Sequence, residues 1–156
     1  MPAISKRIGF ALKMTFAAAL FFAATSPGGI AAARQSREEA VAGASADIGH
    51  IVGNAVEIHP APGLARDPAL PAICKMLADG FHEAENAPGM RAHMEHIVHE
   101  IVIERWTVRE APRWVTIQKG VMTVQTLTDP AGIEHLRPLI VQVLKEDVQL
   151  ATKHVR

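Results

Sequence analysis

Apolar residues recur at helical spacing in four stretches of the chain, and this pattern predicts four helices. The predicted helices cover about residues 36–58, 67–85, 90–109 and 129 onward. The first opens with a capping box in which Ser36 is the cap and Glu39 reaches back. The second and fourth begin with Asp67 and Asp129, each followed by a proline, which fits the first turn of a helix. Short connections between such helices favour antiparallel neighbours.

The third stretch has the broadest apolar stripe and predicts a helix over about 90–109. Its apolar positions are Met90, Met94, Ile97, Val98, Ile101 and Val102. Pro112 follows and would end the helix. In the last helix, Pro138 is expected to cause a kink or a break.

Residues 113–127 fit two descriptions, a helix or a β-hairpin that turns at Lys119-Gly120. The helix would align Trp114, Ile117, Val121, Val124 and Leu127. The hairpin would pair Val115 with Val124, Thr116 with Thr123 and Ile117 with Met122. The density of valine, threonine and isoleucine favours the hairpin. The fold class expected is therefore mainly α: an antiparallel four-helix bundle, with a small β-hairpin at about 114–127 over one side.

The N-terminus has the order of a secretory signal peptide. A basic start is followed by the charge-free apolar run Met14–Thr25, a Ser-Pro-Gly-Gly break and the small residues Ala31 to Ala33. The run is shorter than the ~20 apolar residues that span a bilayer, and the break disfavours an uncleaved anchor. We expect residues 1–33 to be removed after Ala33, which leaves 34–156 as a single domain in the periplasm or outside the cell, without a stable membrane anchor.

Charge and composition exclude several classes of function. The 16 basic and 16 acidic residues of the whole chain balance, and removal of Lys6, Arg7 and Lys13 would leave a mature charge of −3. A neutral to acidic chain argues against nucleic acid as the partner. The mature chain would keep only three aromatic residues, which gives little support to sites that stack sugars or bases. The single cysteine, Cys74, rules out an internal disulfide. It lies on an apolar helix face and is expected to be buried, although a reactive or intermolecularly bonded thiol is the alternative.

One cluster has the chemistry of a metal site. On a helix, His93, His96 and Glu100 would share one face, with His99 within reach of His96. Imidazole and carboxylate ligands suit zinc or copper. The alternative is a solvated polar face, and the spacing lacks the H-E-x-x-H signature of zinc enzymes.

The sequence lacks a nucleophile elbow, a glycine-rich phosphate loop and any other catalytic motif. The interpretation that follows is an exported, non-enzymatic binding or interaction module that acts on a protein partner or by self-association. The alternative is a periplasmic zinc- or copper-binding protein that uses His93, His96 and Glu100. An enzyme is the third and weakest interpretation.

Overall fold

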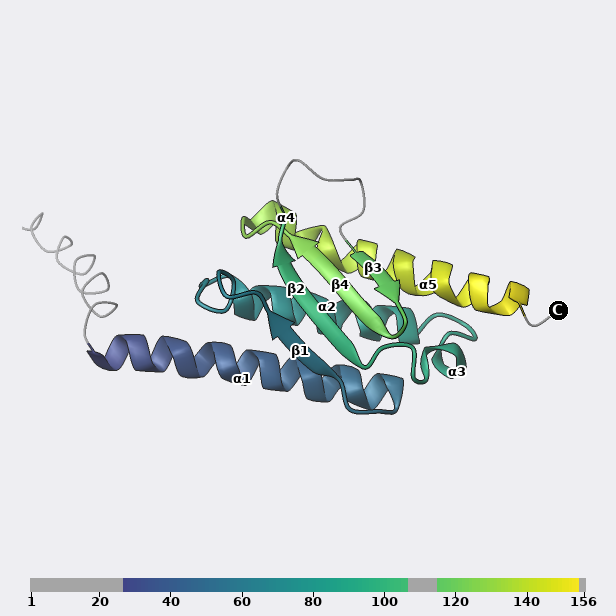
Figure 1. Cartoon of the computed structure of the whole chain (residues 1–156), viewed down its shortest axis with the longest axis horizontal. Coiled ribbons are helices and arrows are strands. Elements are labelled where there is room, and N and C mark those ends of the chain that lie inside the picture. The colour runs from purple at the N-terminus through teal and green to yellow at the C-terminus, as the bar shows by residue number, and fades with distance from the viewer. Residues whose placement is uncertain (1–26, 107–114, 155–156) are drawn as a thin grey trace, which may run out of the picture. The chain divides into compact units, whose positions relative to one another are not determined.

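A computed structural model describes residues 27–106 and 115–154 of the chain (Figure 1). The apolar run of the expected signal peptide lies outside these residues. The chain divides between Ala32 and Ala33 into two units, and all of the described strands lie in the second, Ala33–Arg156. Among the described residues, no helix is both long enough and apolar enough to cross a membrane.

The described part of the chain contains both helices and strands. In chain order they are α1 (Pro27–Val52), β1 (Glu57–Pro60), α2 (Leu70–Glu85), α3 (Arg91–Met94), β2 (Glu100–Arg105), β3 (Val115–Gln118), β4 (Val121–Thr126), α4 (Pro130–Glu134) and α5 (Leu136–His154). The strands form one sheet in the order β1-β2-β4-β3. β1 and β4 run parallel to β2, and β3 runs antiparallel to β4. The parallel pair β1–β2 requires a crossover, which α2 and α3 supply.

This mixed sheet overturns the expected four-helix bundle. The helix expected over 90–109 does not form: α3 ends at Met94, and β2 begins at Glu100. Ile101 and Ile103 are fully buried, whereas Val102 between them is half-buried, so burial alternates as it does along a strand. A run rich in β-branched residues suits this geometry better than a helix. His96 has a φ of 60°, which no α-helix accommodates.

The ends of two other expected helices also differ. The first helix stops at Val52, where Gly53 takes a left-handed φ of 70°. The last two residues expected in it, Glu57 and Ile58, begin β1 instead. The last helix is split into α4 and α5 at His135, upstream of Pro138, which lies in the first turn of α5. Asp129 caps α4 as expected, with its carboxylate accepting a hydrogen bond of 3.0 Å from the Gly132 N–H.

The hairpin forms with the register that the sequence predicts. Its cross-strand pairs include Val115–Val124, Thr116–Thr123 and Ile117–Met122. Lys119 and Gly120 both have positive φ, 52° and 80°, as in a type I′ turn. The hairpin is not a separate cover on a bundle, however, because β4 pairs with β2 inside the sheet.

The core lies between the sheet and its helices. α2 and α5 pack closely together behind the strands in Figure 1, and a β-carbon on Gly80 of α2 would stand 3.0 Å from the Ile140 side chain of α5. The largest buried side chains of this layer include Ile73, Leu77, Phe81, Leu136, Ile140, Ile101, Ile103 and Met122. No described helix lies over β2, β3 or β4 on the opposite side of the sheet (Figure 1).

Candidate functional site

The side of the sheet that faces away from α2 and α5 is here called the open face. Alternate residues of each strand point to it, and none of them is fully buried. Its members are Glu57, His59, Glu100, Val102, Glu104, Thr116, Gln118, Val121, Thr123 and Gln125. They come from all four strands of the sheet, so the surface exists only once distant parts of the chain have paired.

Strand register arranges these side chains in rows across the sheet. One row runs Glu57–Glu100–Val121–Gln118, and the next runs His59–Val102–Thr123–Thr116. In a third row Gln125 donates a hydrogen bond of 3.3 Å to the Glu104 carboxylate. The centre of the open face is therefore aliphatic and hydroxylic, and the β1–β2 side is acidic.

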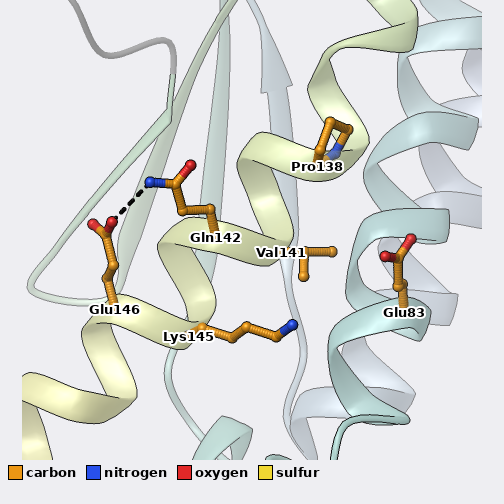
Figure 2. Close-up of a pocket in the computed structure, with 6 residues that line it drawn as sticks. All are labelled: Glu83, Pro138, Val141, Gln142, Lys145 and Glu146. Carbon is orange, nitrogen blue, oxygen red and sulfur yellow. Dashed lines mark hydrogen bonds between the residues drawn. The ribbon is translucent and has the colours of Figure 1, made fainter.

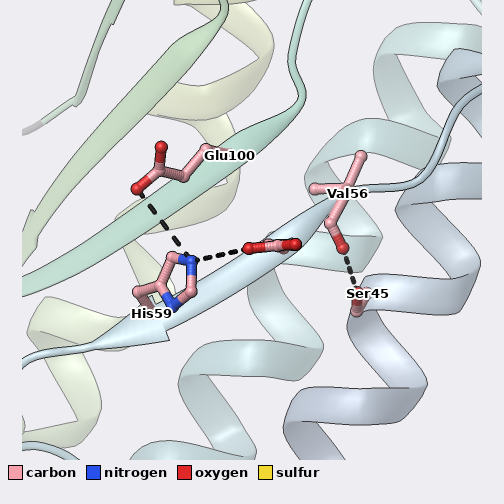
Figure 3. Close-up of polar contacts among 5 residues, drawn as sticks. Ser45, Val56, His59 and Glu100 are labelled. Atoms are coloured by element: carbon pink, nitrogen blue, oxygen red, sulfur yellow. Dashed lines mark hydrogen bonds and ion pairs between the residues drawn. The ribbon is translucent and has the colours of Figure 1, made fainter.

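His59 stands between two carboxylates on the acidic side (Figure 3). Its Nε2 lies 3.2 Å from Oε2 of Glu57 and 4.0 Å from Oε1 of Glu100. Glu57 and Glu100 are direct neighbours across β1 and β2, and like charges in such positions repel. The side chains of Glu57 and His59 are well exposed, at 75% and 53%, and that of Glu100 is less exposed, at 37%. A single imidazole carries at most one positive charge and cannot neutralise two carboxylates.

The start of β1 is fixed in place by two side-chain contacts. Ser45 of α1 donates a hydrogen bond to the carbonyl of Val56, directly before the strand (Figure 3). The Asn54 side-chain amide donates to the carbonyl of Val98 at 3.1 Å, close to the start of β2. These contacts hold β1 in the register that brings Glu57 opposite Glu100.

The residues that define the open face include no lysine and no arginine. The nearest arginine along β2, Arg105, is bound elsewhere: its guanidinium lies 2.6 Å from a carboxylate oxygen of Asp67, in the segment before α2. Lys119 lies in the hairpin turn, at the margin of the sheet. The three carboxylates of the face, Glu57, Glu100 and Glu104, thus dominate its charge.

The four residues of the predicted metal site are not gathered on one helix face. His93 is exposed on the short α3, and His96 lies in the following loop, where its N–H donates to the carbonyl of Val52 at 2.9 Å. His99 is exposed directly before β2, and Glu100 is the first residue of that strand. The helix that would have aligned them is absent because the chain turns into a strand. In the described part of the chain, no group of three His, Cys, Asp or Glu side chains is placed to hold a metal ion.

Glu57 and His59, which the structure places beside Glu100, were not singled out by the sequence pattern. Both lie in the alternating segment Glu57-Ile58-His59-Pro60, of which only Ile58 is buried. That short alternation after Gly53 is the signal that could have revealed a strand. Their approach to Glu100 depends on a parallel pairing that no local pattern encodes.

A shallow groove of about 330 Å³ lies on the helix side, between α2 and α5 (Figure 2). It is lined by Glu83, Pro138, Val141, Gln142, Lys145 and Glu146. Its charged groups already have neighbours: Gln142 donates to Glu146 at 2.9 Å, and Glu83 pairs with Arg137 at 3.1 Å. The groove combines one cation with two carboxylates on exposed helix surfaces and gathers no set of groups suited to a particular ligand.

Cys74 is buried, as the sequence indicated. Its side chain belongs to the core face of α2 and is only 1% exposed, and burial raises the pKa of the thiol from 9.0 to about 11. A protonated and inaccessible thiol is a poor nucleophile and a poor metal ligand. The interpretation as a small core side chain is therefore confirmed.

Comparisons with known proteins leave the open face to be interpreted from its own chemistry. No protein-family model, curated protein or solved structure matches the chain.

Proposed function

We propose that the chain is an exported, non-enzymatic binding module and that the open face is its binding surface. One observation carries the proposal: helices cover one side of the mixed sheet, while the side chains of the other side are only partly buried and have no described helix over them. Parallel strands usually lie in sheets that are covered on both faces. A sheet with two parallel pairs and one uncovered face is therefore suited to receive a partner.

The arrangement of the open face favours binding over catalysis. Enzyme sites are usually concave and enclose most of the substrate. His59 has two carboxylates as ion-pair partners, and it lies on β1, at the edge of the sheet. A surface of this kind can hold a partner by charge and by contact with Val102 and Val121.

The proposal places the protein in the periplasm or outside the cell. Its support is the N-terminal order of basic residues, apolar run and Ala31 to Ala33. The single cysteine, Cys74, is free and buried, so the protein does not depend on a disulfide for its stability. A buried free thiol is compatible with an oxidising compartment.

Site-specific photocrosslinking in the producing cells tests the proposal. A photoreactive amino acid at Thr123, in the centre of the open face, should give a discrete adduct with one protein. The same group at Gln142, which is exposed on α5, is the matched control and should give none. The mass of the adduct distinguishes a foreign partner from a second copy of the chain. Equal labelling at both positions, or none at Thr123, would show that the open face is not a binding surface.

A further inference from the structure

We infer that the partner presents a basic protein segment, with arginine or lysine side chains, to the β1–β2 side of the open face. The inference rests on the proposed function and adds the chemical class of the partner. It starts from an unbalanced arrangement: Glu57 and Glu100 face each other across neighbouring strands, and among the described residues a single imidazole, that of His59, stands between them.

Like charges on directly opposite residues destabilise a sheet, so this pair weakens the pairing of β1 with β2 in the isolated protein. Several carboxylates elsewhere in the described residues have a full cation as partner: Asp67 pairs with Arg105, Asp79 with Lys75 and Glu85 with Arg91. On the open face, Glu57 and Glu100 share one histidine, and Glu104 accepts from the neutral amide of Gln125. A guanidinium or ammonium group from a partner would supply the missing positive charge.

The neighbouring row defines what the rest of the segment contacts. Val102, Thr123 and Thr116 lie next to His59 in register, and neighbouring strands are spaced by about 4.8 Å. The row from β1 to β3 therefore spans about 14 Å, which matches a few residues of an extended chain. An extended segment directs every second side chain to one face. Basic residues at these positions would set their charges beside Glu57, Glu100 and Glu104, with their aliphatic stems against Val102.

Charge also distinguishes a foreign protein partner from a second copy of the chain. A second copy that docked through the same face would bring the carboxylates of Glu57, Glu100 and Glu104 against an identical set. Like-charge contacts of this kind work against association. Complementarity therefore favours a foreign, basic segment over self-association through the open face.

The experiment uses the purified protein and a defined probe, a capped decapeptide of alternating arginine and valine. Backbone amide shifts in two-dimensional NMR spectra report where the peptide binds, and a titration gives Kd. We expect the shifts to cluster on β1, β2 and β4. The double variant E57Q/E100Q should bind about tenfold more weakly, because each exposed charge pair contributes modestly. Binding should also weaken as salt rises, because exposed charges are screened.

The matched control is E83Q/E134Q, which removes the same net charge from exposed positions on α2 and α4. It should leave Kd nearly unchanged. An equal loss in the control, or shifts scattered over the helices, would overturn the inference by showing attraction to net charge alone. Sedimentation of the free protein as a dimer that E57Q/E100Q strengthens would also overturn it.

A final arm separates this inference from the proposed function. If the Thr123 crosslink to a partner in cells persists in E57Q/E100Q at full strength, the open face is a binding surface but its partner is not held by these carboxylates. If the crosslink itself is absent, the proposed function fails first. The loss of the crosslink in E57Q/E100Q but not in E83Q/E134Q supports both.

Discussion

The imidazole of His99 lies directly against the backbone of Gly120: a β-carbon built on Gly120 would overlap Nδ1 of the ring. The carbonyl oxygen of Gly120 also accepts hydrogen bonds from the N–H groups of His99, at 2.9 Å, and Glu100, at 3.3 Å. The hairpin turn thus packs on the two residues that lead into β2. These contacts add to the pairing of β4 with β2, which joins the hairpin to the parallel part of the sheet.

Gly120→Ala should destabilise the protein. Gly120 has a φ of 80°, where an alanine is strained, and such strain costs about 1–3 kcal/mol. The new methyl group would also displace the ring of His99. Urea denaturation measures the change in the free energy of unfolding.

A double-mutant cycle with His99→Ala separates the two effects, because it removes the ring and leaves the backbone strain. We expect the strain to account for most of the loss, since the exposed ring of His99 can move. A Gly120→Ala variant as stable as the wild type would contradict the left-handed turn.

Lys119→Asn should stabilise the protein. Lys119 has a φ of 52°, a region that costs an ordinary residue about 1–2 kcal/mol and that asparagine tolerates. The substitution creates an Asn-Gly turn, the preferred sequence of a type I′ hairpin. We expect the protein to gain up to about 1 kcal/mol, seen as a higher Tm in thermal unfolding. Lys119→Val, which is β-branched, is the control and should lower Tm.

Alanine substitutions along β2 distinguish a strand from a helix. Ile101→Ala and Ile103→Ala should each cost about 2–5 kcal/mol, because both side chains are fully buried. Val102→Ala, on the open face between them, should cost less than about 1 kcal/mol. Denaturant midpoints check this alternation. A large loss at Val102 together with a small loss at Ile103 would point to a helical stripe instead.

The difference between expected and observed fold at residues 90–105 has a definable physical cause. Met94, Val98 and Ile101 satisfy a helical period, but Ile101 and Ile103 also satisfy the period of a strand. The choice between them is made by the left-handed backbone of His96 and by pairing with β1 and β4, which lie far away in the sequence. The β3–β4 hairpin was predictable because its register is set locally by the two turn residues.

The candidate site was less predictable than the hairpin, because it depends on pairing between strands that lie far apart in the sequence. Glu100 appeared in the sequence as a possible metal ligand beside His96, whereas the structure places it opposite Glu57 and near His59. A parallel pairing has no sequence signature that names the partner strand. The burial of Cys74, by contrast, follows from one helix face and was predicted correctly.

Cys74 should give the protein an alkaline pH dependence. Its pKa is about 11 in the folded protein and near the ordinary value of 9.0 when unfolded. Below about pH 9 both states keep the proton and the full stability is present. As pH rises from about 9 to about 11, the unfolded thiol ionises first, so stability falls.

The stability difference between the wild type and Cys74→Ala isolates this effect from other groups that titrate at high pH. Denaturant titrations at pH 8 and 10.5 should show that the wild type loses more stability than the variant. A difference that stays constant across this range would mean that the thiol ionises equally in both states.

Cleavage after Ala33 can be tested by intact-mass analysis of the exported protein, which should begin at Arg34. The A-x-A pattern requires small residues at Ala31 and Ala33 and tolerates other residues at Ala32. Ala33→Arg should therefore leave the precursor uncleaved, whereas the control Ala32→Arg should be processed normally. A cell-associated product that retains residues 1–33 in the wild type would refute the expectation.

The crossover between β1 and β2 also sets the order in which the sheet can assemble. The β3–β4 hairpin closes over two residues, and such local contacts form within microseconds. The partner of β1 begins only at Glu100, after α2 and α3, so the pairing has to close a long loop. A chain that emerges N-terminus first therefore carries β1 without its partner strand until β2 arrives. Until then, the unpaired edge of β1 is open to a chaperone or a protease.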